Sequence, residues 1–435
     1  MAITNVSKSS VVSESTTSTN KGAMAMVTTL FFVWGFLTCL NDILIPHLRS
    51  IFELNYAEVM LVQFVFFSGY FLFAVPAGKL VEIIGYKRTM VLGLLTMAVG
   101  AFLFLPAASV PAFPFFLGAL IILAIGITAL QVSANPYVSV LGPPQTASSR
   151  LNLTQAFNSL GTFVAPYFGS LLILSSAPKS AAEIRRMPAD MLQAYRLHEA
   201  ASVKLPYVLI AIALIALAGV IALYKLPAIA AAPDTELQGG KEGGLRKLLH
   251  QRHLILGVVG IFVYVGAEVS IGSFLVNYFS QPDIGGMSEK TAAVYVSFYW
   301  GFAMIGRFIG AGVLQKVRTD RSLGLVAIVA GVLVAISMLT FGHFAMWAII
   351  LVGLFNSVMF PSIFTLGIAG LGPLTGEGSG LLVAAIVGGA VIPVAEGALA
   401  DHIGIHHAFI LPVLCYIYIA YYGFRGSRQI ATQAA

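Results

Sequence analysis

A carboxylate lies inside the first long apolar stretch of the chain, FFVWGFLTCLNDILIPHL. On a helix, Asp42 and Asn41 share a face with Thr38, and Trp34 lies one turn earlier on the same side. A carboxylate in a membrane-spanning segment costs about 2.5–3.5 kcal/mol and usually marks an ion or substrate path. The competing interpretation is an aspartate that only joins two helices. The combination of carboxylate, amide, hydroxyl and aromatic ring favours a functional site, and it suits a sugar.

Amide side chains recur in two further apolar stretches. Gln131 lies in ITALQVSANPY, and Gln155 and Asn158 lie at helical spacing in RLNLTQAFNSLG. An amide without a partner in hydrocarbon is costly. We therefore expect these side chains to face a shared aqueous cavity or one another. Interhelical hydrogen bonding that merely holds helices together is the alternative.

Polar and aromatic candidates also occur in the apolar stretches of the second half of the chain. Glu268 lies in the middle of one stretch and is the stronger functional candidate, whereas Glu396 lies nearer the end of another and could be a structural partner. Arg307, near the end of its stretch, is expected to serve a conformational latch. The other candidates for binding sugar or lining the site are Asn277, Asn356, Trp300 and Phe360.

The composition around these residues requires a membrane. The 435 residues are 58% hydrophobic and 10% charged, and their mean hydropathy is +0.90. A soluble domain carries about 25% charged residues. Runs of about 20 apolar residues cross the hydrocarbon core as helices, whereas barrel strands would be about 10 residues long and would alternate in polarity. The net charge of +6 does not indicate nucleic-acid binding, because the basic residues lie between the apolar runs.

The runs predict an all-α membrane protein with twelve transmembrane helices in two six-helix bundles. The expected helices are 25–46, 57–78, 88–107, 113–136, 152–175, 204–226, 254–280, 291–315, 322–341, 345–370, 378–400 and 406–425. Segment 227–253 has glycine pairs and mixed charge, so it is expected to be a cytoplasmic linker between bundles 25–226 and 254–425. Residues 1–24 are expected to be a disordered cytoplasmic N-terminus, and 426–435 a cytoplasmic tail.

The distribution of basic residues predicts that both termini are cytoplasmic. In that orientation the inside segments hold 17 of the 24 Lys and Arg residues, as the positive-inside rule requires. Cys39 and Cys415 both lie in expected helices, and no spacing indicates a disulfide framework or a metal site. No separate short apolar region precedes the first helix, so we expect no cleaved signal peptide.

The two halves of the chain show weak similarity to each other. NPYVSVLGP at 135–143 is followed by Pro166, and FPSIFTLGIAGLGP at 360–373 is followed by Pro393. Internal repetition of this kind is typical of transporters whose site lies between two halves. Proline and glycine are also common in membrane helices generally, which is the alternative explanation.

The segment GKLVEIIGYKR joins the second and third expected helices. It resembles the signature G-x-L-x-D-x-x-G-x-K-R of the major facilitator superfamily, with Glu82 at the acidic position. Gly78 would let helices approach closely. Glu82 could accept charge-assisted hydrogen bonds from basic residues or from a facing helix end. The resemblance implies a gating latch made by Gly78, Glu82, Gly85, Lys87, Arg88 and Arg307.

Five blocks together are similar to the fucose–galactose–glucose permease family of that superfamily: NDILIPHL, ANPYVSVLGP, RLNLTQAFNSLG, FYWGFAMIGRFIG and FPSIFTLGIAGLG. The similarity extends over about 25–425. It implies a multi-pass sugar–cation symporter of the bacterial inner membrane that works by alternating access as a monomer. In the L-fucose/proton branch of the family, the first-helix carboxylate matches Asp42 and the fifth-helix amides match Gln155 and Asn158.

The chain departs from the L-fucose branch at two positions. That branch has a glutamate on the fourth helix where this chain has Gln131, and it lacks a carboxylate at Glu268, where YVGAEVSIGS resembles the glucose/galactose branch. A neutral amide cannot carry a proton, but its oxygen can help to ligate a cation. The departure slightly favours sodium coupling, although Asp42 or Glu268 could still carry a proton.

We therefore expect a secondary transporter that imports a neutral hexose, glucose or galactose, with sodium or protons. Asp42, Gln131 and Thr38 would bind the cation, with Na⁺ at Asp42 as the one possible metal ion. Enzyme activity and a cofactor are not expected, because no P-loop, HExxH or nucleophile elbow occurs. The alternatives are an L-fucose/proton symporter, a drug/proton antiporter and a sugar sensor that does not transport.

Overall fold

The regular elements of the computed structural model are all helices. It describes residues 20–52, 56–109, 112–172, 187–188, 190–192, 194–195, 197, 204–227 and 243–428. Side chains are described for these residues except 39–61, 63, 166–172, 243–245, 289–290 and 293. Asn41 and Asp42 therefore lie outside the described side chains, and the expected N-terminal segment, linker and tail lie largely outside the described residues.

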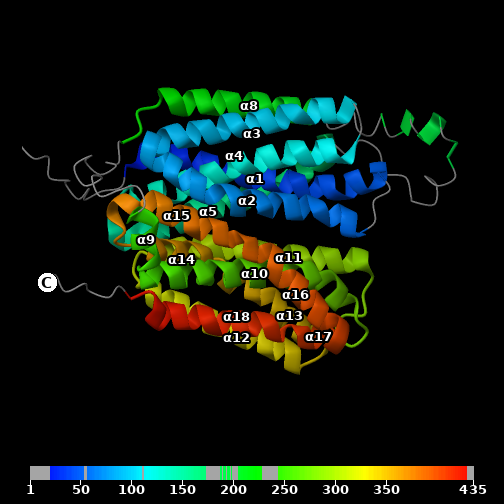
Figure 1. Ribbon diagram of the computed structural model, residues 1–435. Coiled ribbons are helices and arrows are strands. Elements are labelled where there is room, and N and C mark those ends of the chain that lie inside the picture. Colours follow the sequence, from blue (N-terminus) through cyan, green and yellow to red (C-terminus); the bar gives the residue numbers. More distant parts are fainter. Residues whose placement is uncertain are drawn as a thin grey trace, which may run out of the picture.

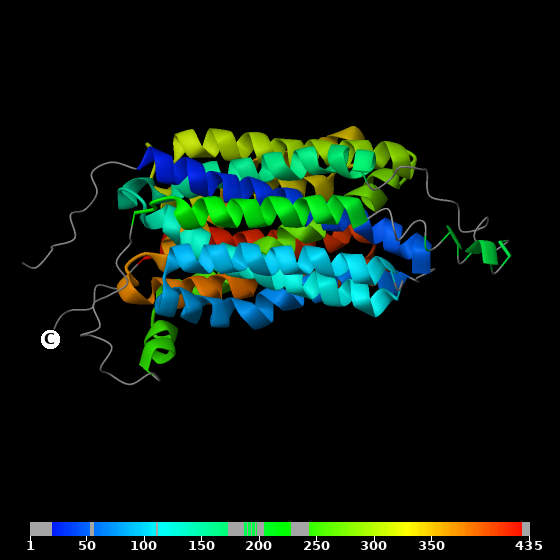
Figure 2. The ribbon, with the colours of Figure 1, turned by 90° about the horizontal axis from the view of Figure 1, so that it is seen from above.

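Six long helices form the N-terminal half and lie alongside one another (Figure 1). They are α1 (Lys21–Phe52), α2 (Tyr56–Ile84), α3 (Tyr86–Ser109), α4 (Phe113–Val140), α5 (Ala147–Leu172) and α8 (Lys204–Leu223). Figures 1 and 2 show the start of α1 and the last turns of the chain at the same end of the bundle, here called the termini end. Both ends of the described chain therefore lie on one side.

The C-terminal half repeats this plan with more interruptions. The short α9 (Gly243–Leu249) lies in the expected linker and precedes α10 (Arg252–Ser280), α11 (Glu289–Val313) and α12 (Thr319–Leu339). The remaining elements are α13 (Gly342–Asn356), α14 (Met359–Ile368), α15 (Thr375–Ala384), α16 (Gly388–Ile403), α17 (Ile405–Ala408), α18 (Ile410–Tyr421) and the π-helical turn η4 (Tyr422–Gly426).

Three of the expected continuous helices are divided, and the division of 406–425 is a turn at Phe409 between α17 and α18. The expected helix 345–370 is interrupted between α13 and α14, where Pro361 has no N–H for the carbonyl of Ser357. The expected helix 378–400 is interrupted by the 3₁₀ turn η3 (Ala385–Val387), just before a glycine pair that weakens helix formation. Because irregular backbone in a membrane must find partners inside the protein, these interruptions are places to look for a site.

Arg150 organises the connection between α4 and α5. Its guanidinium donates to four main-chain carbonyls at distances of 2.6–3.2 Å. The last carbonyls of a helix have no intrahelical donor, so one buried arginine satisfies several of them. The carbonyls belong to Val138, Ser139, Gly142 and Pro143.

Eleven helical segments of the described chain are long and apolar enough to cross a membrane. The twelfth expected span, α5, is not among them; it carries Arg150 near its start and several amides. Those polar residues do not face lipid alone, since α5 packs against α1 within its own half and against α11 of the other half. Its polarity reflects contacts with other helices.

Two seams between the halves meet near the termini end. The glycine seam joins α2 and α15 through Gly78, Gly376, Ser379 and Gly380, and Ser379 also reaches α4. The polar seam joins α5 and α11 through Ser149, Asn152, Ser159, Arg307 and Ala311. In this conformation the halves are therefore in direct contact at this end.

Candidate functional site

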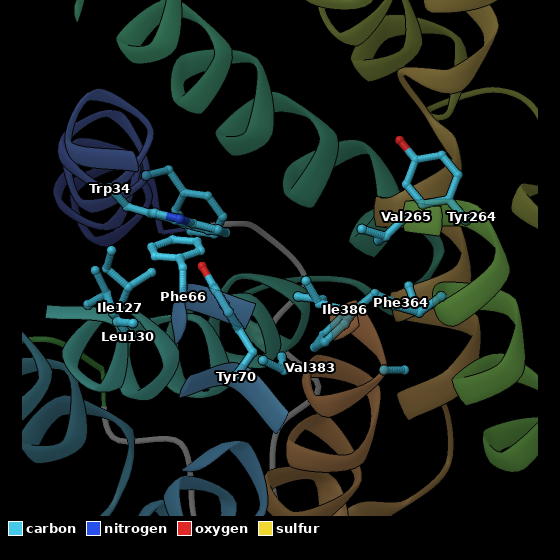
Figure 3. Packing of buried hydrophobic residues seen from close by; sticks show 14 of the residues in the cluster. Trp34, Phe66, Tyr70, Ile127, Leu130, Tyr264, Val265, Phe364, Val383 and Ile386 are labelled. Atoms are coloured by element: carbon cyan, nitrogen blue, oxygen red, sulfur yellow. The ribbon is translucent and has the colours of Figure 1, made fainter. Parts of the chain in front are cut away.

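Trp34, Tyr70 and Gln131 form a buried polar cluster in the N-terminal half. The Gln131 amide donates to the Tyr70 hydroxyl at 2.7 Å, and Trp34 is a second hydrogen-bond partner of that hydroxyl. Figure 3 shows Phe66 between the Trp34 and Tyr70 rings, and the Phe66 and Tyr70 centroids are 5.3 Å apart in an edge-on arrangement. Gln131 Oε1 is buried and has no hydrogen-bond partner among the described residues. The cluster thus retains one unused acceptor.

The expected cation site can be followed only in part. The Asn41 and Asp42 side chains lie outside the described residues. The Thr38 hydroxyl is half-buried and donates to the Trp34 carbonyl of its own helix at 3.0 Å. Thr38 therefore lies on the α1 turn between Trp34 and Asp42.

The α1–α5 crossing brings Asn158 against the first helix. Asn158 donates from its amide to the carbonyl of Phe31 at 2.9 Å. The crossing is tight, because a Cβ on Gly161 would come within 2.9 Å of the Phe36 nitrogen. Gln155 is 5% exposed. Asn158 thus makes a hydrogen bond that holds two helices together, which was the alternative to a cavity-lining role. Gln155 lies where α5 meets α11 of the other half, since its carbonyl accepts from Arg307.

A second cluster fills the centre of the C-terminal half. Asn356 is fully buried, donates to the Tyr299 hydroxyl at 2.8 Å and accepts from the Tyr416 hydroxyl at 2.8 Å. The Tyr264 hydroxyl donates to the Asn356 carbonyl at 3.1 Å. This carbonyl ends α13, so the tyrosine supplies a donor where the helix is interrupted. Asn356 was expected to bind sugar, but its amide is engaged by protein partners in this conformation.

Glu268 and Arg307 connect this cluster to the N-terminal half. The half-buried Glu268 lies beside the Tyr264 hydroxyl and close enough to Arg307 for the charges to interact, while its Oε1 has no partner among the described residues. Arg307 donates across the polar seam to the Ser159 hydroxyl and to the Gln155 carbonyl, the latter at 3.5 Å. One arginine therefore acts on a carboxylate in its own half and on α5 of the other.

The remaining predicted substrate residues lie at the margins of these clusters. Asn277 is exposed and stands nine residues beyond Glu268 on α10, or about 14 Å along the helix, so the structure does not bring it to the cluster. Trp300 is 44% exposed and lies against Gly272, with its ring edge-on to Tyr299 at 5.1 Å. Phe360 is half-buried and stacks on Phe364.

The expected gating residues divide between two places. A Cβ on Gly78 would lie 2.7 Å from the Gly376 carbonyl oxygen. Glu82 accepts from the backbone N–H of Glu377 and contacts the carboxyl group of that residue, at the start of α15. The structure therefore has Glu82 at a facing helix end, which is one of the two partners that the motif left open.

The other motif residues hold the N-terminal half together. Gly85 has φ +83°, a left-handed conformation that favours glycine between α2 and α3. Lys87 donates to the Ala222 carbonyl at 2.7 Å, near the end of α8, where a cation is favourable. Arg88 is exposed. Lys87 thus secures α8 within its own half.

Sequence reasoning missed Tyr70 and Tyr416. Each is a tyrosine inside an apolar run, and a buried tyrosine hydroxyl usually needs a partner; this signal could have identified them. An open, mostly apolar groove on α1 and α5, lined by residues such as Thr29, Phe32 and Phe157, contains none of the predicted site residues. The clusters, and not this groove, contain the predicted chemistry.

Comparison with known proteins identifies the family. Residues 26–392 match the family model of the Major Facilitator Superfamily. The chain belongs to the major facilitator superfamily. It is 52% identical over 407 residues to a glucose/galactose transporter of Brucella abortus, with 94% of each chain covered. It is 36% identical over 398 residues to the L-fucose-proton symporter of Escherichia coli, with 91% of each chain covered.

The fold of this superfamily member matches a solved transporter. The crystal structure of the superfamily transporter FucP in the outward conformation aligns with a TM-score of 0.87 and 35% identity, covering 94% of this chain and 99% of the other. The predicted membrane fold and family are confirmed, and the relatives are transporters, not enzymes. The chain is a multi-pass membrane protein and a sugar transporter.

Proposed function

We propose that this transporter imports a neutral hexose, glucose or galactose, by cation symport through alternating access. The observation that carries the proposal is the 52% identity, over 94% of both chains, with a protein named as a glucose/galactose transporter. Gln131 and Glu268 support it, because these two positions depart from the L-fucose branch. The chain would reside in a bacterial inner membrane as a monomer.

The coupling ion we propose is the proton. The relatives whose names state a coupling ion are L-fucose-proton symporters, and nothing supports the preference for sodium drawn from Gln131. Asp42 would take up the proton on α1. Gln131, fixed by Tyr70 with an unused Oε1, would accept a hydrogen bond from the protonated acid or from the sugar.

The sugar would lie between the two clusters. Trp34 offers an aromatic face in one half, and Glu268 offers an unused carboxylate oxygen in the other. Sugar hydroxyls need donors and acceptors together, which Gln155, Glu268 and Arg307 supply. Sugar binding at Arg307 would then affect the polar seam, because the same guanidinium donates to Ser159.

The decisive experiment is uptake of a labelled-hexose panel into proteoliposomes under imposed proton and sodium gradients in turn. Glucose or galactose should accumulate with a proton gradient. Asp42→Asn should reduce accumulation at least about tenfold and spare sugar exchange, because exchange needs no net proton transfer. The matched control is Asp401→Asn, an exposed carboxylate of α16, which should behave as the wild type.

Four other outcomes would replace all or part of the proposal. Wild-type accumulation by Asp42→Asn would remove the coupling role from Asp42. Sugar binding without uptake by the wild-type protein would indicate a sensor, and stabilisation by hydrophobic cations but not by hexoses would indicate a drug antiporter. Preference for L-fucose over glucose and galactose would indicate an L-fucose symporter.

A further inference from the structure

Glu396 is a buried carboxyl group that the proposed transport mechanism does not use. It lies on α16 and is 0% exposed. The Ser270 hydroxyl of α10 donates to its Oε2 at 2.5 Å. Its Oε1 is also buried and has no partner among the described residues. One oxygen is therefore satisfied, and the other faces the protein interior without a donor.

The helices around Glu396 supply no compensating positive charge. α2, which α16 also contacts, carries a single basic residue, Lys79, beside Gly78 of the glycine seam. Over the described spans of α10, α16, α17 and α18, Arg252 is the only Lys or Arg. It stands 18 residues before Ser270, about 27 Å along α10. On α16 itself, Asp401 and His402 are more than one helical turn away.

The groups that do face Glu396 are neutral. α10 presents Ser270 to it, and α18 presents Cys415, which interacts with it electrostatically. Glu268, two residues before Ser270, lies on a different face of α10. A carboxylate in such surroundings would be an uncompensated charge in a dry interior, whereas a carboxylic acid there costs far less.

A proton on Glu396 accounts for the geometry. The protonated group has one O–H donor and retains acceptor capacity. Ser270 can then donate to one oxygen while the second carries the proton. The alternative ligand, a sodium ion, would need several oxygen ligands, and among the described residues no group of acidic or histidine side chains could hold a metal ion.

The position of Glu396 links it to movement of the halves. α15 packs mainly on α2 and α4 of the N-terminal half, with a smaller contact to α10, whereas α16 packs mainly on α10 of its own half, with a smaller contact to α2. Between them lies η3, and Pro393 interrupts the hydrogen bonding of α16 three residues before Glu396. Separation of α15 from α2 would therefore bend this helix pair at η3 and shift α16 along α10.

We propose that Glu396 and Ser270 form a proton-binding site that is occupied while the halves are closed at the termini end and is emptied when they separate there. The site adds a second titratable position to the transport cycle. It rests on the proposed proton coupling for its role in transport, but its occupancy can be measured without transport.

The experiment compares the wild type with Glu396→Gln, Glu396→Asp and the control Asp401→Asn in proteoliposomes. Exchange of labelled glucose measures sugar translocation, and proton-driven accumulation measures coupling. Glu396→Gln should keep at least about half of the exchange rate and lose accumulation about tenfold, because the amide mimics the protonated acid permanently. Glu396→Asp should accumulate sugar better than Glu396→Gln.

Infrared difference spectra of the purified protein, recorded without and with glucose, provide the independent measurement. A carbonyl band of a protonated carboxylic acid should change on sugar addition in the wild type and should be missing in Glu396→Gln. If that band is unaffected by Glu396→Gln, or if this variant accumulates sugar as the wild type does, the proposal is overturned. A variant that loses exchange as well is judged by the band alone.

The result separates the two proposals. Absence of hexose exchange by the wild type refutes the proposed function, whereas loss of the assigned carboxylic acid band in Glu396→Gln would still support proton binding at Glu396. Normal exchange and accumulation by Glu396→Gln leaves the hexose symporter intact and refutes only the second site.

Discussion

The two seams hold the halves together at the same end by different physical means. In the glycine seam, backbone meets backbone: a Cβ on Gly380 would lie 2.7 Å from the Ala74 carbonyl oxygen. In the polar seam, side chains meet carbonyls: Asn152 donates to the Arg307 carbonyl at 2.6 Å, and Ser149 donates to the Ala311 carbonyl at 2.6 Å. One seam depends on shape and the other on directed hydrogen bonds.

The difference indicates separate roles in opening. Hydrogen bonds to exposed carbonyls can be exchanged for bonds to water when the halves part, so their net value is about 0.5–1.5 kcal/mol each. Close packing has no such substitute, because atoms that border a gap have no neighbour to attract them by dispersion. The glycine seam should therefore determine the geometry of the closed state. The polar seam should set the fraction of molecules in that state.

The glycine seam also contains one directed bond. Ser379 donates to the Val132 carbonyl on α4 at 3.1 Å. Pro136 stands four residues after Val132 and has no N–H, so the α4 backbone cannot satisfy this carbonyl. The Ser379 hydroxyl, from the other half, thus supplies the hydrogen bond to α4 that Pro136 cannot donate.

The largest effect should come from filling the glycine seam. Gly380→Val would place a branched side chain against the backbone of α2, and overpacking costs about 1–3 kcal/mol. The closed state would fall about 5- to 150-fold in population, and hexose exchange in proteoliposomes should fall by a factor in the same range, about 5- to 150-fold.

A glycine elsewhere provides the matched control for this substitution. A Cβ on Gly219 of α8 would meet nothing within 4 Å, so Gly219→Val should keep wild-type exchange. Thermal unfolding of both purified variants checks that they are folded. Full exchange by a folded Gly380→Val would show that close packing of α2 on α15 is not required.

The next effect tests the polar seam. Arg307→Gln would remove the donors to Ser159 and Gln155 and the cation near Glu268, and hydrogen bonds involving charged groups contribute about 1.5–3 kcal/mol. We expect exchange to fall about 10- to 100-fold, with partial recovery in Arg307→Lys, which keeps the charge. Arg321→Gln changes an exposed arginine and is the control; equal exchange by Arg307→Gln and the control would contradict the role.

Sequence reasoning located the spans and the chemistry better than the contacts. Hydropathy reports the length of a membrane segment, so eleven of the expected spans recur as apolar helical segments of the described chain. The signature left two partners open for Glu82, basic residues or a facing helix end, and Glu82 lies against the start of α15. Helical periodicity cannot state which helix lies opposite, so the pairing of Tyr70 with Gln131 was missed. It also does not register an interruption such as the one after Asn356, whose carbonyl accepts from Tyr264 of a distant segment.

The structure places two of the predicted sugar-binding residues, Asn277 and Asn356, in very different surroundings. Asn277 was chosen because an amide in an apolar run is unusual, yet it lies near the end of α10 and is exposed. Asn356 was chosen for the same reason, and two tyrosines satisfy its amide. Residue type alone does not distinguish an amide that awaits a ligand from one that is already paired.

The smallest effect concerns the bond that crosses from α15 to α4. Ser379→Ala would leave the buried Val132 carbonyl without a donor, which should cost about 1 kcal/mol and lower exchange roughly fivefold. Pro136→Ala would give α4 its own N–H for that carbonyl, so Ser379→Ala should change exchange less than about twofold in this background. A double-mutant cycle measures the difference. Equal effects of Ser379→Ala in both backgrounds would mean that the hydrogen bond from Ser379 to the Val132 carbonyl does not matter for exchange. The glycine seam would then depend on packing alone.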